Sequence, residues 1–314
     1  MEPIRRAVID VGTNSIKLLV ADVAGRNVQP VHEESRQTRL GRGFYETRQL
    51  QPDAIVRTSE AVAEFARTAR EHKAATIRAI ATSAARDAVN ADELTSAIQR
   101  ASGLKVDIIS GDREAGWAFQ GVTTDPELAK TPLLLLDVGG GSTQFILGRG
   151  DHKHFAHSFP LGAVRLLEKF PHSDPPTRAE FTACRDWLKN FLQSEVRPKL
   201  EPALRHETDF QSAGVQLVGT GGTSSILARI EAKLDRYDRE RLEATRLSLE
   251  QVKAHRKWLW SLPLTERKEI TGLPKLRADV ILTGVLIYEV VMEEFGFKLL
   301  RVSTRGLRFA AVMD

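Results

Sequence analysis

"LLLLDVGGGSTQFILGRG", residues 133–150, places an aspartate and three consecutive glycines between two apolar runs. Short apolar runs bounded by turn residues are typical of buried strands. Glycine has no Cβ, so it forms tight turns and lets the backbone approach a ligand closely. The stretch therefore predicts a strand, a glycine turn and a second strand, with Asp137 near the end of the first.

A second stretch, "AVIDVGTNSIKLLVADV" at residues 7–23, repeats this layout. Asp10 aligns with Asp137, which lies 127 residues further along the chain. An Asp and a Gly in a turn recur by chance, because turns favour both residues. The apolar frame on both sides makes duplication the better interpretation. Two domains of one topology are expected, with both turns bordering one cleft. The other aligned pairs are Val11 with Val138, Gly12 with Gly139, and Ser15 with Ser142.

Predicted strands alternate with predicted helices along the whole chain, which indicates an α/β fold. The polar segment 124–132 is the predicted break between the two halves. We therefore expect one domain at residues 1–128 and a second at residues 129–314.

Several helices have recognisable ends. One should begin near Pro52, where a proline is tolerated. Another should have Asn90 as its N-cap and stop at Gly103. A third is expected over residues 179–199, and "VILTGVLIYEVV" is expected to be a buried helix.

The composition is that of an ordinary globular protein, with 314 residues, 42% of them hydrophobic and 27% charged. The net charge of +4 suits an anionic partner, but a solvated surface is the better interpretation of the charge alone. No nucleic-acid partner is expected. Cys184 is the single cysteine, so no disulfide can form within the chain, and zinc-site spacings are absent. The sequence shows neither a signal-peptide pattern nor an apolar run long enough for a membrane span. A cytoplasmic protein without a membrane partner is expected.

The glycine turns have the chemistry of a phosphate site. Backbone N–H groups at such turns converge on phosphate oxygens, and carboxylates hold the divalent cation that neutralises the phosphates. A third turn, "VGTGGTSS" at residues 218–225, opens a helix whose N-terminus also favours anions. Any one of these turns could need glycine only for its backbone conformation, but the three turns together favour phosphate binding. Neither the Walker P-loop pattern nor the dinucleotide fingerprint fits. The predicted phosphate-binding residues are Gly12, Thr13, Asn14, Ser15, Gly139, Gly140, Gly141, Ser142, Thr143, Gly221, Gly222 and Thr223.

The combination of motifs resembles the exopolyphosphatase/guanosine pentaphosphate phosphohydrolase (Ppx/GppA) family, in its short two-domain form. This family is a branch of the actin-like ATPase and sugar-kinase superfamily. The resemblance implies two ribonuclease-H-like domains with an interdomain cleft, and it covers essentially the whole chain. The motifs that carry it are "VIDVGTNSIKLLVADV", "TRLGRG", "ATSAARDAVN", "ISGDREA", "LLLDVGGGST", "FPLGAVRLLE", "LVGTGGTSS" and "RADVILTG".

The resemblance also implies a reaction, the Mg²⁺-dependent hydrolysis of a terminal phosphoanhydride. Glu114, in "ISGDREA", matches the catalytic glutamate, which orients and deprotonates the attacking water. Arg86 matches an arginine that grips phosphate oxygens. Asp10 and Asp137 match the metal-associated acids. A homodimer is the expected assembly.

One position departs from the family pattern. Gln144 stands where family members usually have glutamate after Gly-Gly-Ser-Thr. Glutamine offers a metal a neutral oxygen but supplies no charge and accepts no proton as a base. We assign Gln144 to the metal site with Asp10 and Asp137. The first functional hypothesis is an exopolyphosphatase acting on inorganic polyphosphate. The alternatives are a guanosine pentaphosphate 5′-phosphohydrolase and a non-catalytic protein that binds polyphosphate or a nucleotide.

Overall fold

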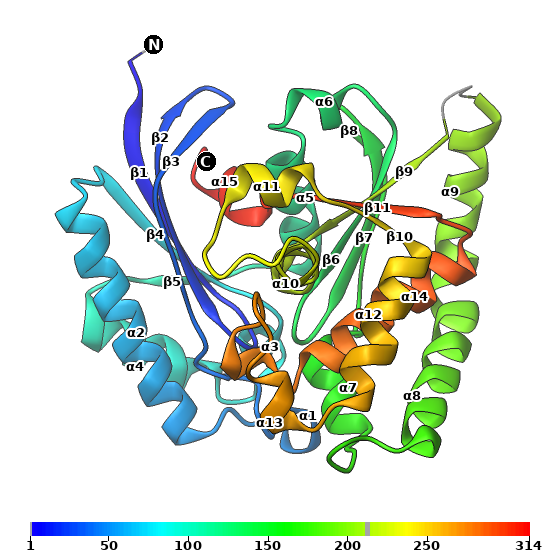
Figure 1. Cartoon of the computed structure of the whole chain (residues 1–314). Helices are drawn as coiled ribbons and strands as arrows, with labels where there is room; N and C mark the ends of the chain where they lie inside the picture. Colours follow the sequence, from blue (N-terminus) through cyan, green and yellow to red (C-terminus); the bar gives the residue numbers. More distant parts are fainter. Residues whose placement is uncertain (1, 211–213) are drawn as a thin grey trace. The chain divides into compact units, whose positions relative to one another are not determined.

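The computed structural model describes residues 2–210 and 214–314, and the chain folds into two compact units (Figure 1). The first unit contains residues 1–124 and returns with residues 305–314. The second contains residues 125–304. Each unit has its own mixed β-sheet, which confirms the predicted α/β class.

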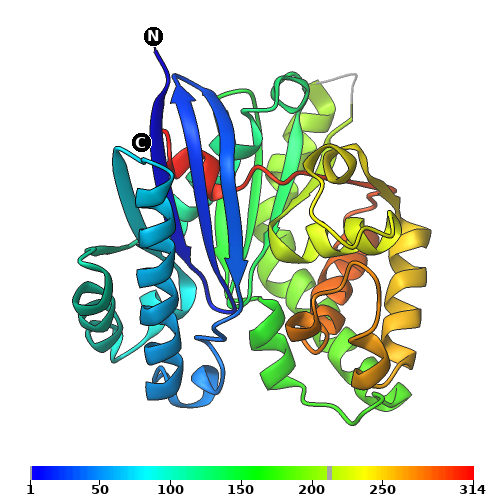
Figure 2. The same cartoon turned by 60° about the vertical axis from the view of Figure 1, so that its left-hand side comes forward.

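The first sheet has five strands in the order β3-β2-β1-β4-β5. β1, β2 and β3 form an antiparallel meander, whereas β4 and β5 run parallel to β1 (Figure 2). The carboxyl ends of β1, β4 and β5 therefore share one edge of the sheet. The strands are β1 (Ile4–Val11), β2 (Ile16–Ala24), β3 (Asn27–Arg36), β4 (Thr76–Ala81) and β5 (Val106–Ile108).

Alternate residues of β1 face opposite sides of this sheet, as strand geometry requires. Ala7, Ile9 and Val11 pack in one apolar cluster with residues of α2 and α4. The helices of this unit are α1 (Phe44–Thr47), α2 (Pro52–Glu71), α3 (Ser83–Asp87), α4 (Ala91–Ser102), α5 (Gly111–Val122) and α15 (Leu307–Ala311).

The second sheet has six strands in the order β10-β11-β9-β6-β7-β8. Its antiparallel strands β6, β7 and β8 correspond to β1, β2 and β3, and the parallel strands β9 and β11 correspond to β4 and β5. The duplication predicted from the sequence is thus a repeat of strand order, with β10 added at the edge. The strands are β6 (Leu133–Val138), β7 (Thr143–Arg149), β8 (His152–Phe159), β9 (Gln216–Thr220), β10 (Arg246–Ser248) and β11 (Leu299–Val302).

Several helices of the second unit pack against α14, whose residues 281–292 are all buried. "VILTGVLIYEVV" is therefore a buried helix, as predicted. The helices are α6 (Pro126–Ala129), α7 (Ala163–Lys169), α8 (Arg178–Phe191), α9 (Arg197–Phe210), α10 (Gly221–Glu231), α11 (Arg239–Ala244), α12 (Leu249–Ser261), α13 (Leu264–Arg267) and α14 (Ile281–Glu294), with the π-helix η1 (Leu192–Val196) and the 3₁₀-helix η2 (Lys275–Arg277).

Two helix predictions need correction. The helix expected over residues 179–199 ends as α-helix at Phe191, passes through the π-helical turn η1 and continues as α9 to Phe210. Asn90 precedes α4 but does not cap it with its side chain. Its amide instead pairs with both backbone groups of Leu50, at 2.8 and 3.1 Å. Gly103 ends α4 in a left-handed conformation, and Pro52 begins α2, as predicted.

The unit boundaries differ from the predicted domains at residues 1–128 and 129–314. The chain passes from the first unit to the second after residue 124, four residues earlier than predicted, and the last ten residues belong to the first unit. These last residues belong to the first unit because Gly306 lies against Gly121 of α5. A Cβ added at Gly121 would come within 2.1 Å of the Gly306 carbonyl oxygen. Arg308 also donates to the carbonyl of Leu18, at 2.8 Å.

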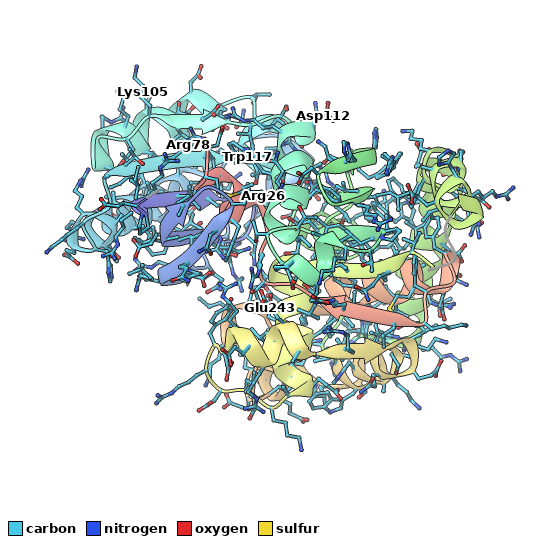
Figure 3. The ribbon with its side chains drawn as sticks, turned by 90° about the horizontal axis from the view of Figure 1, so that it is seen from above. Arg26, Arg78, Lys105, Asp112, Trp117 and Glu243 are labelled. Atoms are coloured by element: carbon cyan, nitrogen blue, oxygen red, sulfur yellow. The ribbon has the colours of Figure 1, made fainter. Side chains whose placement is uncertain are left out.

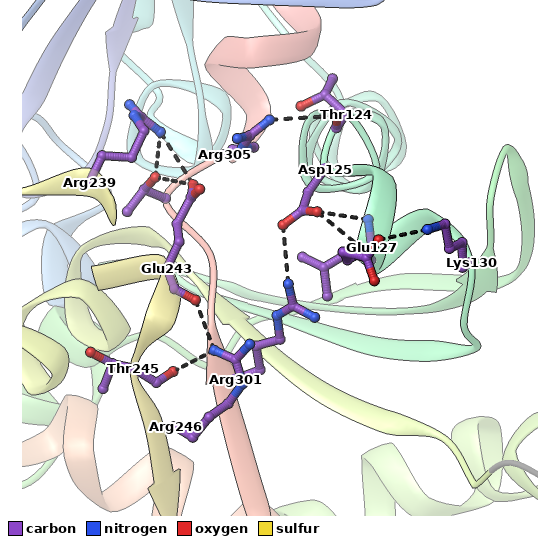
Figure 4. A network of polar contacts seen from close by, with 12 residues as sticks. Thr124, Asp125, Glu127, Lys130, Arg239, Glu243, Thr245, Arg246, Arg301 and Arg305 are labelled. Atoms are coloured by element: carbon purple, nitrogen blue, oxygen red, sulfur yellow. Dashed lines mark hydrogen bonds and ion pairs between the residues drawn. The ribbon is translucent and has the colours of Figure 1, made fainter. Parts of the chain in front are cut away.

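Polar contacts hold the chain near the two points where it passes from one unit to the other, after residues 124 and 304 (Figure 4). In the second unit, Asp125 forms an ion pair with Arg301, at 3.2 Å, and its side chain also caps α6. In the first unit, Arg305 donates to the carbonyl of Thr124 at 3.5 Å. Over the described residues, no helix combines the length and the apolar character that crossing a membrane requires.

Candidate active site

The predicted site residues of the first unit gather at the carboxyl edge of its sheet. Asp10 is the penultimate residue of β1, and the first glycine turn follows it. Arg86 lies on α3, directly after β4, and Glu114 lies in the first turn of α5, after β5. Because β1, β4 and β5 are parallel, the fold brings these three predicted groups to one edge.

The first glycine turn is closed by a hydrogen bond from the Gly12 N–H to the Ser15 carbonyl, at 3.1 Å. The carbonyls of Thr13 and Asn14 accept from the N–H groups of Gly41 and Arg39, at 2.7 and 3.0 Å. In a trans peptide the N–H points opposite to the C=O. The loop at residues 38–43 therefore holds the two carbonyls behind the turn, so that the following two N–H groups are directed away from that loop.

The second turn repeats this arrangement. Gly139 donates to the Ser142 carbonyl at 3.0 Å, as Gly12 does to Ser15. The carbonyls of residues 139 and 140 accept from the first N–H groups of α7, and the Gly141 carbonyl accepts from the side chain of Arg165 at 2.8 Å. With three successive carbonyls engaged on one side, the N–H groups of residues 140–142 are directed to the other. Such a row of backbone N–H groups is an anion-binding nest.

The third turn lies against the second within the same unit. Gly221 has φ +89° and begins α10, and a Cβ there would come within 2.5 Å of the Asp137 carboxylate. A Cβ at Gly222 would come within 2.8 Å of the Arg277 guanidinium. The α10 N-terminus thus faces one carboxylate and one guanidinium. The Thr223 side chain lies against Gly284 of α14. The N–H of Thr223 is in the first turn of α10, where backbone N–H groups have no partner within the helix.

Glu114 and Arg86, the predicted catalytic pair, contact each other directly. An Nη1 of Arg86 lies 3.0 Å from Oε2 of Glu114 and 3.0 Å from the Ile109 carbonyl. The Glu114 residue is 7% exposed although it opens a helix. Burial and the hydrogen bond from Arg86, which also donates to the Ile109 carbonyl, fix the Glu114 carboxylate in position. A solvated acid at the start of a helix would be exposed. Neither residue's role is tested by this geometry, and both remain predictions.

Three of the buried polar atoms that have no partner in the described residues lie at this edge. Among the described residues, Asp10 Oδ1, Asn14 Nδ2 and Ser83 Oγ have no hydrogen-bond partner. Buried polar groups are normally satisfied, so such atoms need an explanation. Burial raises the pKa of the Asp10 carboxyl, and the positive charges of Lys17 and Arg308 oppose part of that rise. A cation beside Asp10 would offset the cost of burying its charge.

The predicted metal ligands fit Mg²⁺ only as part of a larger set. Within the described residues, no group of three or more His, Cys, Asp and Glu side chains could hold a metal ion. Mg²⁺ usually binds one or two carboxylates and completes its shell with water and substrate phosphates. Asp10, with its partnerless buried oxygen, fits such a site, and Asp137 is the matching carboxylate of the second unit.

Gln144 occupies a position that the repeat makes informative. It pairs with Asp137 across β6 and β7, just as Lys17 pairs with Asp10 across β1 and β2. Its side-chain N–H₂ donates to the hydroxyls of Ser142 and Ser158, at 2.9 and 3.1 Å. Gln144 thus braces the second turn, and its predicted metal contact remains a prediction. The hydroxyl of Thr143 donates to the Leu161 carbonyl, so its proton is already engaged.

Sequence reasoning missed several residues of these turns. Ser83 and Arg277 lie inside quoted motifs but have side chains whose placement depends on the fold. Gly162 was also missed: a Cβ there would come within 2.4 Å of the backbone of Gly140. Arg165 follows it in "FPLGAVRLLE" and orients the Gly141 peptide.

Comparisons with known proteins agree with this geometry. Residues 19–313 match the model of the Ppx/GppA phosphatase family. The chain belongs to the Ppx/GppA family. It is 35% identical over 300 residues to exopolyphosphatase 2 of Mycobacterium tuberculosis, covering 92% of this chain and 90% of that protein. It is 29% identical to a guanosine-5′-triphosphate,3′-diphosphate pyrophosphatase of Photobacterium profundum, covering 98% of this chain and 58% of that protein.

A solved structure gives the same assignment. The Aquifex aeolicus Ppx/GppA enzyme superposes with a TM-score of 0.77 at 30% identity, over 99% of each chain. The two units of this Ppx/GppA protein are thus ribonuclease-H-like domains, as the resemblance implied. Family membership makes the chain a phosphoanhydride hydrolase, which argues against the non-catalytic alternative.

Proposed function

We propose that this Ppx/GppA protein is a Mg²⁺-dependent exopolyphosphatase, which removes terminal orthophosphate from inorganic polyphosphate. The observation that carries the proposal is the pair of matched turns, each closed by a Gly N–H to Ser carbonyl bond. Their N–H groups suit a substrate made of successive phosphates. The relative named exopolyphosphatase 2, at 35% identity, supports the same substrate class.

In the proposed mechanism Glu114 orients a water molecule for in-line attack on the terminal phosphorus and takes its proton. The bond from this phosphorus to the bridging oxygen breaks, and the shortened polyphosphate chain leaves with that oxygen. Arg86 positions Glu114 and contacts the transferred phosphoryl group. The N–H groups of residues 14–15 and 140–142 stabilise the negative charge on the phosphate oxygens. Phosphoryl transfer depends mainly on such positioning and electrostatic stabilisation.

Asp10 and Asp137 are the residues proposed to hold Mg²⁺. The cation, when bound, neutralises charge on the substrate phosphates. Asp10 supports this role because its Oδ1 is buried without a hydrogen-bond partner among the described residues. Gln144, next to Asp137 on the neighbouring strand, would add at most a neutral oxygen.

Guanosine pentaphosphate is the second candidate substrate. The relative from Photobacterium profundum, whose name refers to a guanosine nucleotide, supports it at 29% identity. A nucleotide enzyme needs a base pocket in addition to phosphate donors, and aromatic residues make up only 6% of this chain. Polyphosphate needs no such pocket, so it is the substrate that we favour.

The test is orthophosphate release from polyphosphate, guanosine pentaphosphate and ATP, each measured with and without Mg²⁺. The proposal expects the highest kcat/KM with polyphosphate and loss of activity when Mg²⁺ is chelated. A higher kcat/KM with guanosine pentaphosphate would favour the second candidate. Activity that survives chelation would contradict the metal proposal. The homodimer and the cytoplasmic location stay predictions.

A further inference from the structure

A cavity of about 450 Å³ lies in the first unit, away from the predicted active site. It is lined by Arg6 near the start of β1, by Thr76 at the start of β4, and by Lys105 just before β5. Asp10 and the first glycine turn lie at the other ends of these strands. Four residues of strand separate Arg6 from Asp10, which corresponds to about 13 Å.

The cavity combines an apolar floor with a charged rim. Its floor consists of Ala7, Ile77, Ala79, Leu104, Ala311 and Val312. Its charged groups are Arg6, Arg78, Lys105, Asp107 and Asp314. In Figure 3, Arg78 lies beside Trp117, and Lys105 projects from the periphery of this unit. The volume lies within the range of small-molecule sites and exceeds what an inorganic phosphate ion fills.

The carboxylates of the rim are already paired with arginines. Asp314 contacts Arg78 at 2.9 Å and Arg113 at 3.4 Å, while Asp107 contacts Arg113 at 2.9 Å. The hydrogen bond from Arg78 holds the pKa of the Asp314 carboxyl below its usual value. The two acids are therefore neutralised by Arg78 and Arg113.

The other two cations have no carboxylate partner among the described residues. Arg6 donates to the backbone carbonyls of Met313, at 2.6 Å, and Val312, at 3.5 Å, which do not neutralise its charge. Lys105 is exposed at the rim and forms no ion pair within the part of the chain that the structure describes. The cavity therefore carries an excess of positive charge over an apolar floor.

We propose that this cavity is a second ligand site, which binds a small organic phosphate monoester. The phosphate would contact Arg6, Arg78 and Lys105, and the organic part would cover the apolar floor. Asp314 would compete with the ligand phosphate for Arg78, because both are anions and Arg78 faces the cavity.

Because of this competition, two substitutions should change the ligand affinity in opposite directions. Adenosine monophosphate is the probe, because it has a phosphate monoester, a flat organic body and no phosphoanhydride for the enzyme to cleave. Isothermal titration should show that Lys105→Ala weakens its binding about fivefold, which corresponds to one solvated charge contact. Asp314→Asn should tighten binding by a similar factor, because it removes the competing charge. Lys153→Ala, an exposed lysine of the second unit, is the matched control and should change nothing.

Polyphosphate hydrolysis without the probe should be the same in the wild type, Lys105→Ala and Lys153→Ala, since none of these changes touches the active site. Adenosine and inorganic phosphate alone should each bind more weakly than adenosine monophosphate. The proposal is overturned if adenosine monophosphate shows no binding at millimolar concentration. It is also overturned if Lys105→Ala and Asp314→Asn shift its affinity in the same direction, or if neither shifts it.

Discussion

Gly162→Ala should impair catalysis through the backbone of the second glycine turn. Gly162 precedes α7, and its Cα faces the peptide units of Gly140 and Gly141. An added Cβ would lie 2.4 Å from the carbonyl carbon and oxygen of Gly140 and 2.5 Å from the carbonyl carbon of Gly141. These are backbone atoms, so no side-chain rotation can relieve the overlap.

The expected magnitude follows from the distances. Carbon atoms in ordinary contact lie about 3.5 Å or more apart, so the turn must move by about 1 Å. A misplacement of about 1 Å at a reacting group costs about 10²-fold in rate. The methyl group also overpacks the interior, at a cost of about 1–3 kcal/mol in the free energy of unfolding. We therefore expect a folded protein whose kcat falls about a hundredfold.

The assay is orthophosphate release from polyphosphate, measured together with the melting temperature. Gly214→Ala is the matched control in the same unit, because a Cβ at Gly214 meets nothing within 4 Å. It should leave both kcat and the melting temperature unchanged. A Gly162→Ala enzyme with kcat within twofold of the wild type would show that the position of the second turn does not govern the reaction.

Three further outcomes are expected. Burial raises the pKa of the Cys184 thiol to about 12, so a disulfide reagent at pH 8 should not modify the native protein but should modify it in denaturant; rapid modification of the native chain would contradict this burial. Hydrogen bonds from Thr177 and Ser173 lower the pKa of Glu180 from 4.5 to about 2, so its stabilisation should be complete above pH 4.5 and lost as the pH falls toward 2. Glu180→Gln should accordingly melt below the wild type at pH 7, with a difference that shrinks at pH 3; a constant difference would rule out the charge as its cause. Gln144→Glu places a carboxylate opposite Asp137, so half-maximal activity should require less Mg²⁺; superimposable Mg²⁺ titrations would exclude this position from the metal site.

The sequence contained most of the fold because the decisive signals were local. Apolar runs beside glycine turns located β1, β2, β6 and β7, and their repeat indicated two units of one topology. The last ten residues lie in the predicted second domain but belong to the first unit of the structure. The sequence could not show this, because only the long-range approach of Gly306 to Gly121 places α15 beside α5.

The candidate site was predictable to a similar extent. The aspartates and glycines could be named because turn chemistry restricts which residues fit. The groups that hold the turns from behind could not be named, because their roles depend on contacts between residues far apart in the sequence. Arg165 lies 24 positions after Gly141, whose carbonyl it binds. The side-chain amide of Asn90 forms hydrogen bonds with Leu50 rather than capping its own helix.

Glu114 is the residue that we propose to activate the water that attacks polyphosphate. Glu114→Gln keeps the size of the side chain but removes its capacity to accept a proton. The decisive measurement is orthophosphate release by this variant, made alongside equilibrium binding of polyphosphate. We expect turnover to fall by about 10²–10⁴-fold while polyphosphate binding and melting temperature stay close to those of the wild type. Near-normal turnover in a variant that still binds polyphosphate would remove Glu114 from the mechanism and contradict the account.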